Sequence, residues 1–424
     1  MIVVNRAVFL DRDGTITKSV HILTKIEEIE LEEKAAEGIA FLKKSNFKII
    51  VVTNQPQVAR GMCTEDDVKR INRKMARDLE ELGVVLDGIY FCPHHPEMHE
   101  DVPEYALKYR VECECRKPNI GMLKKAGEVF GVDLSKSFVI GDRTVDVQTG
   151  KNAGCKTVLV KTGAGGNDKK YDSAPDFVCE NLLDAAKIIV RDSTKAVILV
   201  GGKGERLWPL TKDIPKPMIK IGGKPVLEHQ IMHLKKHGIT DIIVCGSYLV
   251  EKIKDYFGDG DNFGVRIRYP YEPEPLGSGG AVRNAADFLD CENFVVLSGD
   301  VMNDMNIGAA LDQHILKEAI ATAIVRETDH PQDSDIVVMD NENRIIKYIG
   351  RGQESHKTAN SGIMIFNRKI IDKIPDGISN MEKDVMFKII DNEKVYGYIS
   401  KDYIKDIGTF DRLEAARKHF EVAT

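Results

Sequence analysis

Two carboxylates, Asp11 and Asp13, follow the first apolar segment of the chain in the run DRDGT. Residues 7–10 before them are short, apolar and typical of a buried strand. Open α/β folds bind their ligands beyond the carboxyl ends of such strands. A calcium loop would need a glutamate at its twelfth position, where this chain has Ile22. The run therefore indicates a ligand-binding or catalytic site rather than a calcium loop.

Three further segments place polar groups at the expected ends of strands and before a helix. A hydroxyl and an amide suit phosphate oxygens, a carboxylate suits Mg²⁺, and a lysine beside an arginine suits phosphate charge. Each segment alone is a weak signal, but their order along the chain fits a phosphatase. The residues are, in order, Thr53 and Asn54, Arg116 and Lys117, and Asp142.

A cysteine cluster indicates a metal site. Cys92 begins a C-x-H pattern that ends at His94, and after eighteen intervening residues a C-x-C pattern supplies Cys113 and Cys115. Three thiolates and one imidazole are typical of a structural Zn²⁺ site, and the charged intervening segment would gain from such a staple. Three buried free cysteines are the alternative, which the polar surroundings disfavour. Spacing alone leaves open whether His94 or His95 is the ligand.

A glycine-rich loop follows the apolar residues 196–200 in the run GGKGERL. Glycines let backbone N–H groups approach a phosphate closely, and Arg206 can reach the same charge. Lys216 lies between two prolines, which restrict its backbone and suit a fixed phosphate contact. The run lacks the GK[ST] of a Walker A loop, and Leu207 stands where a dinucleotide fingerprint needs glycine. The loop glycines are Gly201, Gly202 and Gly204.

The elements that must position these residues alternate between short β-branched runs and amphipathic helical stretches. This alternation predicts α/β architecture, with a mainly parallel sheet covered by helices. It pauses in a polar stretch at 191–195 and then restarts, so we expect two Rossmann-like α/β domains, 1–191 and 192–424. In the first we expect strands at 7–10, 48–53, 138–141 and 157–161 and helices at 34–45, 64–82 and 119–130; in the second, strands at 196–200, 241–245, 265–271, 294–298 and 320–325.

The composition indicates which kinds of partner the protein binds. The 424 residues include 60 basic and 66 acidic side chains, a net charge of −6, without a basic block. Sequence-independent nucleic-acid binding is therefore disfavoured. Apolar runs stay far below the ~20 residues of a membrane span, and the first residues lack the charge of a signal peptide. We expect a cytoplasmic protein that acts on small molecules.

The motifs of residues 5–190 resemble those of the haloacid dehalogenase superfamily, in its phosphatase branch. The resemblance implies that Asp11 is the nucleophile and that Asp13 is the acid and base. Thr53 and Lys117 would hold the phosphoryl group. Mg²⁺ would bind Asp11, Asp13 and Asp142. Asp146 has two equally consistent interpretations. It supports the metal ligands from close by, or it is a solvated acid at the start of a helix.

The zinc loop and its flanking motifs are similar to those of the D-glycero-D-manno-heptose 1,7-bisphosphate phosphatases. In that family the first histidine, here His94, is the zinc ligand. Arg60 and Arg116 would anchor the second phosphate of the sugar, since guanidinium groups match phosphate oxygens. Histidinol-phosphate phosphatases share the zinc loop, but the QxxARG segment favours the heptose branch. Pro56 and Gln57 depart from the small residues usual there.

Residues 195–424 resemble the sugar-1-phosphate nucleotidyltransferases. By that resemblance Arg206 and Lys216 neutralise the phosphates, and a second Mg²⁺ binds Asp300 and Asp406. A loop with Gly277 and Gly279 would lie near base and sugar, and Asn360 near the sugar. The usual Glu-Lys-Pro before the Asn360 strand is missing, and Arg351 stands in its place.

Together the two resemblances predict a bifunctional enzyme of nucleotide-activated heptose synthesis. The first domain would remove the 7-phosphate, and the second would join the resulting heptose 1-phosphate to a nucleotide. Similarity to mannose-1-phosphate guanylyltransferases favours GTP. One alternative is a phosphatase for another ester, such as histidinol phosphate, fused to a mannose-1-phosphate guanylyltransferase. Another is a catalytically inactive, ligand-binding second domain.

Overall fold

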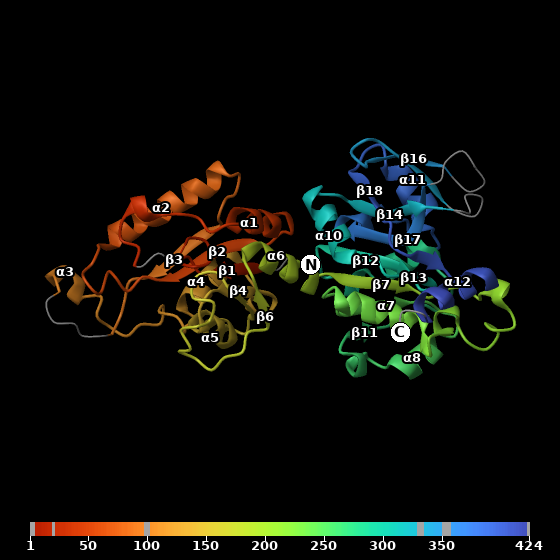
Figure 1. Ribbon diagram of the computed structural model, residues 1–424, viewed down its shortest axis with the longest axis horizontal. Helices are drawn as coiled ribbons and strands as arrows, with labels where there is room; N and C mark the ends of the chain where they lie inside the picture. Colours follow the sequence, from red (N-terminus) through yellow and green to blue (C-terminus); the bar gives the residue numbers. More distant parts are fainter. Residues whose placement is uncertain (1–4, 19–21, 97–101, 329–334, 350–357, 422–424) are drawn as a thin grey trace. The chain divides into compact units, whose positions relative to one another are not determined.

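A computed structural model describes residues 5–18, 22–96, 102–328, 335–349 and 358–421. The chain forms two compact units, Met1–Val190 and Arg191–Thr424, each with its own sheet (Figure 1). Both are α/β, as expected from the sequence. Within the described residues, no helix is long and apolar enough to cross a membrane.

The first unit is built on a six-stranded sheet in the order β3-β2-β1-β4-β5-β6, in which every pair is parallel. Helix α4 packs on one face. The strands are β1 (Ala7–Leu10), β2 (Lys48–Asn54), β3 (Gly88–Cys92), β4 (Phe138–Gly141), β5 (Lys156–Val160) and β6 (Phe177–Cys179). The helices are α1 (Ala35–Lys44), α2 (Glu65–Glu81), α3 (Glu104–Leu107), α4 (Gly121–Phe130), α5 (Thr144–Ala153) and α6 (Leu182–Asp192).

The central position of β1 explains its sequence. All four of its residues are inaccessible to solvent, because a parallel strand in mid-sheet is covered on both faces and reads as a continuous apolar run. Strand β1 lies between β2 and β4. The residues that follow these three strands therefore meet at one edge of the sheet.

The second unit has a nine-stranded mixed sheet with the path β11-β10-β7-β12-β17-β14-β18. The first four strands are parallel, whereas β17 runs antiparallel to both its neighbours. Its strands are β7 (Lys195–Leu199), β10 (Asp241–Cys245), β11 (Arg266–Arg268), β12 (Asn293–Ser298), β14 (Ala321–Glu327), β15 (Ile336–Met339), β16 (Ile345–Ile349), β17 (Thr358–Asn367) and β18 (Val395–Ile399).

Shorter elements complete the second unit. Two small antiparallel pairs lie outside the main sheet: β8 (Lys220–Ile221) with β9 (Lys224–Pro225), and β13 (Val301–Asn303) with β19 (Ile404–Asp406). The helices are α7 (Val226–Lys236), α8 (Val250–Phe257), α9 (Gly277–Asn284), α10 (Ile307–Leu316), α11 (Phe387–Ile389) and α12 (Phe410–Glu421).

The polar stretch at 191–195 is more ordered than its composition predicts. Helix α6 continues to Asp192, and β7 already begins at Lys195. Lys195 is largely buried, and its ammonium donates to the carbonyl of Phe288 and pairs with Asp241 and Asp290. These partners offset the cost of placing a lysine in a buried strand.

Candidate active sites and metal centre

Three carboxylates and one lysine converge at the carboxyl edge of the first sheet. Asp11 follows β1, and its backbone N–H donates to Ile140 of β4 at 2.9 Å. Asp142 follows β4, and Asp146 lies in the first turn of α5. One carboxylate oxygen from each of the three lies within 4.8 Å of the others. All three are buried, so their charges need nearby cations.

Lys117 supplies one of those cations. Its buried ammonium lies 2.9 Å from Asp11 Oδ1 and also donates to Asp146. Burial alone would lower the pKa of Lys117, but the charges of Asp11 and Asp146 raise it overall. The lysine is therefore held protonated, beside the atom that the resemblance makes the nucleophile.

The carboxylate group could hold a metal cation. Burial and the charge of Asp11 raise the pKa of Asp142 to about 7, and burial raises that of Asp146 to about 6. Asp142 Oδ1 is buried without a hydrogen-bond partner among the described residues. A Cβ at Gly14 would lie 2.4 Å from Asp142 Oδ2, so only glycine admits this carboxylate. An oxygen-only donor set with an unpaired carboxylate oxygen fits Mg²⁺.

Asp13 is held apart from this acidic group. Arg12 makes a bidentate contact with it, in which Nε and Nη2 donate to the Asp13 carboxylate at 2.8 and 2.9 Å. Gln55 donates to the same carboxylate at 2.9 Å. Burial alone would raise the pKa of Asp13, but Arg12, Gln55 and Thr17 lower it overall. The sequence-based prediction of Asp13 as a third Mg²⁺ ligand stays a prediction, since its carboxylate is engaged by Arg12.

Thr53 and Asn54 end β2 beside this site. Thr53 is buried, and its hydroxyl accepts from Gln55 at 2.9 Å. The Asn54 amide makes two bonds to one residue: its Oδ1 accepts from the backbone N–H of Lys117 at 3.0 Å, and its Nδ2 donates to the Lys117 carbonyl at 3.1 Å. Asn54 therefore clamps the backbone that carries the Lys117 ammonium.

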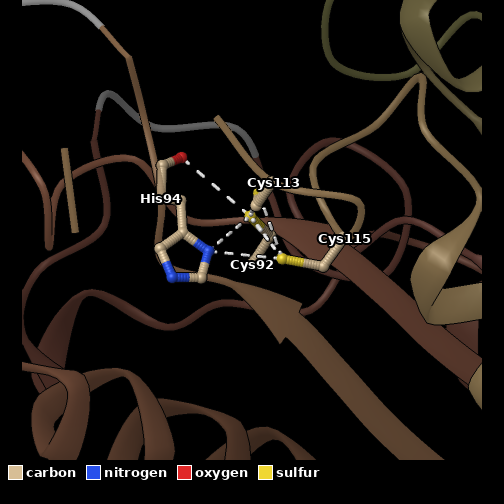
Figure 2. A group of neighbouring side chains, drawn as sticks. All are labelled: Cys92, His94, Cys113 and Cys115. Carbon is tan, nitrogen blue, oxygen red and sulfur yellow. Dashed lines mark hydrogen bonds between the residues drawn. The ribbon is translucent and has the colours of Figure 1, made fainter. Parts of the chain in front are cut away.

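Figure 2 shows Cys92, His94, Cys113 and Cys115 pointing toward one another. The sulfur–sulfur separations are 3.2 to 3.5 Å, and His94 Nδ1 lies 3.3 and 3.6 Å from the sulfurs of Cys115 and Cys92. A tetrahedral Zn²⁺ needs donor atoms roughly 3.5 to 3.8 Å apart. The donor set therefore fits zinc, and His94 rather than His95 contributes the nitrogen to the group.

Two residues between His94 and Cys113 contact residues 59–65, which include Arg60. Tyr105 and Arg110 donate to the carbonyls of Gly61 and Ala59. On the other side, Cys115 leads directly into Arg116 and Lys117, and Arg116 donates to the His94 carbonyl at 3.1 Å. The cysteine–histidine centre thus supports both arginines that the sequence assigns to the second phosphate.

The second unit has a pocket of about 310 Å³ at the carboxyl ends of β7, β10 and β12. Five of the residues singled out from the sequence line it: Gly201, Gly202, Lys216, Gly277 and Asp300. Gly202 has a φ of 114°, and a Cβ at Gly277 would lie 2.4 Å from the Ser379 carbonyl oxygen. Both positions therefore require glycine.

The β13–β19 pair places the backbones of the two residues predicted to hold the second Mg²⁺, Asp300 and Asp406, side by side. Val301 pairs with Asp406, and the N–H of Ile407 donates to the carbonyl of Asp300 at 2.9 Å. Each carboxylate has a cationic partner: Lys216 lies 2.9 Å from Asp300, and Arg412 contacts both oxygens of Asp406 at 3.1 Å.

Arg206 is held near Asp406, because its neighbour Leu207 is buried together with Ile407 in one apolar cluster. A Cβ at Gly408 would lie 3.0 Å from Arg206 Nη2 and 2.6 Å from Asp406 Oδ1. Gly204 supports the loop by accepting from the Thr211 hydroxyl at 2.7 Å. Gly279 lies in α9, and Asn360 in β17 accepts from the N–H of Gly362. Arg351 lies outside the described residues.

Comparisons with known proteins match each half of the chain to a different enzyme family. The nucleotidyl transferase family matches residues 195–422, more than half of the chain, and the HAD-hydrolase-like family matches residues 114–185. The chain belongs to the nucleotidyl transferase family. It is 38% identical over 184 residues to the D-glycero-beta-D-manno-heptose-1,7-bisphosphate 7-phosphatase of Photorhabdus laumondii, covering 43% of this chain and 94% of the relative. It therefore joins a HAD-like phosphatase domain to a nucleotidyl transferase domain.

Another relative matches the second domain. The mannose-1-phosphate guanylyltransferase of Mycobacterium tuberculosis is 35% identical over 218 residues, or 50% of this chain. The chain spans 61% of the length of that relative. The crystal structure of HddC from Yersinia pseudotuberculosis is similar with a TM-score of 0.49 and 28% identity, covering 54% of this chain and 99% of that one.

Several residues of this phosphatase–nucleotidyl transferase chain were not singled out from the sequence. Arg12 stands inside the DRDG run, but nothing in its spacing shows that its buried side chain holds Asp13 and Asn72. Arg412 lies near Asp406 in sequence and Glu272 lies near Gly277, yet no motif singles them out. Their side-chain contacts are seen only in the structure, so spacing along a single sequence carries no clear signal for them.

Proposed function

We propose that the first unit removes the 7-phosphate of D-glycero-D-manno-heptose 1,7-bisphosphate. The group of Asp11, Asp142, Asp146 and Lys117 carries this proposal, because it joins a nucleophile, a place for Mg²⁺ and a fixed cation in a buried site. The choice of sugar is supported by the heptose bisphosphatase relative, of which the chain covers nearly the whole length.

In the proposed reaction, an Asp11 oxygen attacks the phosphorus and the bond from phosphorus to the sugar oxygen breaks. Asp13 gives its proton to that oxygen, and Lys117 and Thr53 hold the phosphoryl oxygens. Asp13 then takes a proton from water, whose oxygen attacks the same phosphorus, so that phosphate leaves and Asp11 is restored. Since Arg12 holds Asp13 ionised, Asp13 must gain its proton as substrate enters.

Mg²⁺, held by Asp11 and Asp142, supplies charge neutralisation to the transferring group. Asp146 orients Lys117 and adds negative charge beside the ion. We assign zinc to the cysteine–histidine centre, in a structural role, because a closed set of four protein donors leaves no position for a reacting molecule.

In the second unit, we propose transfer of a nucleotidyl group from an NTP to heptose 1-phosphate. The sugar phosphate oxygen attacks the α-phosphorus, and pyrophosphate leaves. Lys216 and Arg206 neutralise the phosphates, and the glycine loop offers backbone N–H groups. Asp300 and Asp406 are the expected ligands of a second Mg²⁺. The guanylyltransferase relative supports GTP as the donor.

The two proposed reactions fit in series, since the product of the phosphatase is the sugar 1-phosphate that the nucleotidyl transferase needs. A substrate panel tests each half. We expect phosphate release from the heptose bisphosphate to exceed that from histidinol phosphate, and pyrophosphate release with heptose 1-phosphate to exceed that with mannose 1-phosphate. Higher activity on histidinol phosphate or mannose 1-phosphate would overturn the choice of sugar, and no pyrophosphate with any pair would favour an inactive second domain.

A further inference from the structure

Gln55 is a fully buried amide at the phosphatase site to which the proposed reaction assigns no role. It directly follows β2, and its backbone N–H donates to the carbonyl of Cys92 at 2.8 Å. Its side-chain Nε2 donates to Asp13 Oδ2 and to Thr53 Oγ1, both at 2.9 Å. One amide group therefore contacts both the proposed acid and the hydroxyl that is proposed to hold the phosphoryl group.

Two donors fix the orientation of the Gln55 amide. Arg12 Nη2 donates to Gln55 Oε1 at 2.6 Å, and Gln57 Nε2 donates to the same oxygen. A guanidinium group can only donate, so the oxygen of Gln55 must face Arg12 and its nitrogen must face Thr53. Gln57 keeps its own orientation because its Nε2 also donates to the carbonyl of Leu23 at 3.2 Å.

This order of donors and acceptors decides what the Thr53 hydroxyl can do. A hydroxyl accepts through its lone pairs and donates its single hydrogen. Thr53 Oγ1 accepts from Gln55, and among the described residues no acceptor receives the Thr53 hydrogen. Thr53 is only 1% exposed, and a buried donor without an acceptor is costly. The oxygens of a bound phosphoryl group would supply the acceptor that this hydrogen lacks.

We infer that Gln55 is a positioning residue that directs the hydrogen of the Thr53 hydroxyl at the phosphoryl group. This inference rests on the proposed phosphatase reaction and deepens it, from the residues that touch the phosphoryl group to the group that orients one of them. Because the hydrogen is aimed before substrate binds, Thr53 needs no reorientation as charge develops on the phosphoryl oxygens.

A double-mutant cycle in the full chain tests the inference. The probe is orthovanadate, which adopts the five-coordinate geometry of a phosphoryl group in transfer, and its Kd is measured by titration calorimetry with Mg²⁺ present. We expect Thr53→Val to raise the Kd about 10-fold and Gln55→Met to raise it about 3- to 10-fold, since both weaken a charge-assisted hydrogen bond. In the Thr53→Val chain, Gln55→Met should raise the Kd less than about twofold, because no hydroxyl is left to direct.

Gln55→Glu keeps the shape of the side chain and reverses its polarity, because a carboxylate accepts the Thr53 hydrogen and draws it from the phosphoryl group. Its loss of vanadate affinity should exceed that of Gln55→Met. The added charge acts with and without the Thr53 hydroxyl and so cancels from the cycle, which decides if Gln55→Met does not fold. The control Gln148→Met removes an amide that bonds to Asn152 and Ser173, and should leave the Kd unchanged.

Equal fold losses from the Gln55 variants with and without the Thr53 hydroxyl would overturn the inference, because Gln55 would then not act through Thr53. An unchanged Kd in Gln55→Met would overturn it as well. Failure of the proposed function is distinguishable: the wild-type chain would then release no phosphate from the heptose bisphosphate, whereas the vanadate cycle needs no turnover. A wild-type chain that binds no vanadate would overturn the inference together with the phosphatase proposal.

Discussion

At the residue scale, the phosphatase site is a set of buried charges that balance only when a cation is present. Asp11, Asp142 and Asp146 face one another; Lys117 neutralises part of their charge, and Arg143 lies 4.0 Å from Asp142. Buried carboxylates without partners are costly, so the site gains stability from Mg²⁺ as well as reactivity.

The binding of Mg²⁺ should therefore depend on pH. Carboxyl groups must lose their protons before they bind a metal, and burial raises the pKa of Asp142 to about 7 and that of Asp146 to about 6. We expect the Kd for Mg²⁺, measured by titration calorimetry, to rise roughly tenfold between pH 8 and pH 6. The metal-free site shows the opposite trend in stability: its folded carboxyls bind protons that the unfolded chain does not, so lowering the pH from 8 to 6 stabilises it. Equal Kd values at both pH values would contradict this account.

Asn54 illustrates what a single sequence can predict of a site and what it cannot. Its position at the end of the second strand was predicted, and the pattern favoured substrate binding, which stays a prediction. The structure shows its amide bound to the backbone of Lys117. The partner of a side chain depends on residues 63 positions away, and spacing along one strand carries no information about them.

Asn54→Ala separates these two roles. Loss of the clamp should displace Lys117 and lower kcat of the phosphatase about 10- to 100-fold with little change in KM. Asn152→Ala is the matched control, because Asn152 donates at 3.0 Å to the carbonyl of the next residue, Pro118, and should change kcat less than about twofold. A rise in KM at constant kcat would instead support direct contact with substrate.

At the scale of elements, the strands buried on both faces were predictable to within a residue, whereas the short ones were not. β1 and β4 have the predicted bounds because a strand covered on both sides must be apolar throughout. The two- and three-residue strands β8, β9, β13 and β19 were not predicted, since such lengths show no periodicity. Yet β13 and β19 are the elements that bring Asp300 to Asp406.

Residues 113–117 join the cysteine–histidine centre to Lys117 of the phosphatase site. Cys113→Ser should reduce bound zinc below one equivalent per chain, measured by elemental analysis. It should lower phosphatase kcat. It should also lower the unfolding temperature of the first unit by several degrees, at about 2–4 °C per kcal/mol for a unit of this size. Nucleotidyl transfer should persist.

Cys179→Ser is the control for the zinc content of Cys113→Ser. Cys179 is buried in β6, outside the metal group, so this variant should keep its zinc even if it unfolds more easily. Full zinc content in Cys113→Ser, or equal zinc loss in Cys179→Ser, would contradict the assigned ligand set.

The start of α9 tests the pocket of the second unit. In Gly277→Ala, the new Cβ would meet the carbonyl of Ser379 at 2.4 Å, and the residue would keep a φ of 73°. We expect a loss of about 1–3 kcal/mol in the free energy of unfolding and a marked loss of pyrophosphate release. Gly223→Ala carries a similar positive φ of 80° with nothing within 4 Å of the added Cβ, so chemical denaturation should show a smaller loss. Equal losses would mean that the clash at Ser379 is relieved by movement.

At the scale of the whole molecule, the chain carries two units with separate sheets and separate candidate sites. The sequence predicted this division because the α/β alternation pauses and restarts. It could not predict that β17 runs antiparallel through the second sheet, since an apolar strand reads the same in either direction.

The central claim is that the phosphatase of the first unit makes the substrate of the second. The measurement uses Asp11→Asn in the full chain, supplied with Mg²⁺, GTP and either heptose 1,7-bisphosphate or heptose 1-phosphate, with the nucleotide sugar detected by mass spectrometry. The account predicts no nucleotide sugar from the bisphosphate and wild-type yield from the monophosphate, because only the nucleophile is lost. Nucleotide sugar formed from both substrates, or from neither, would contradict it.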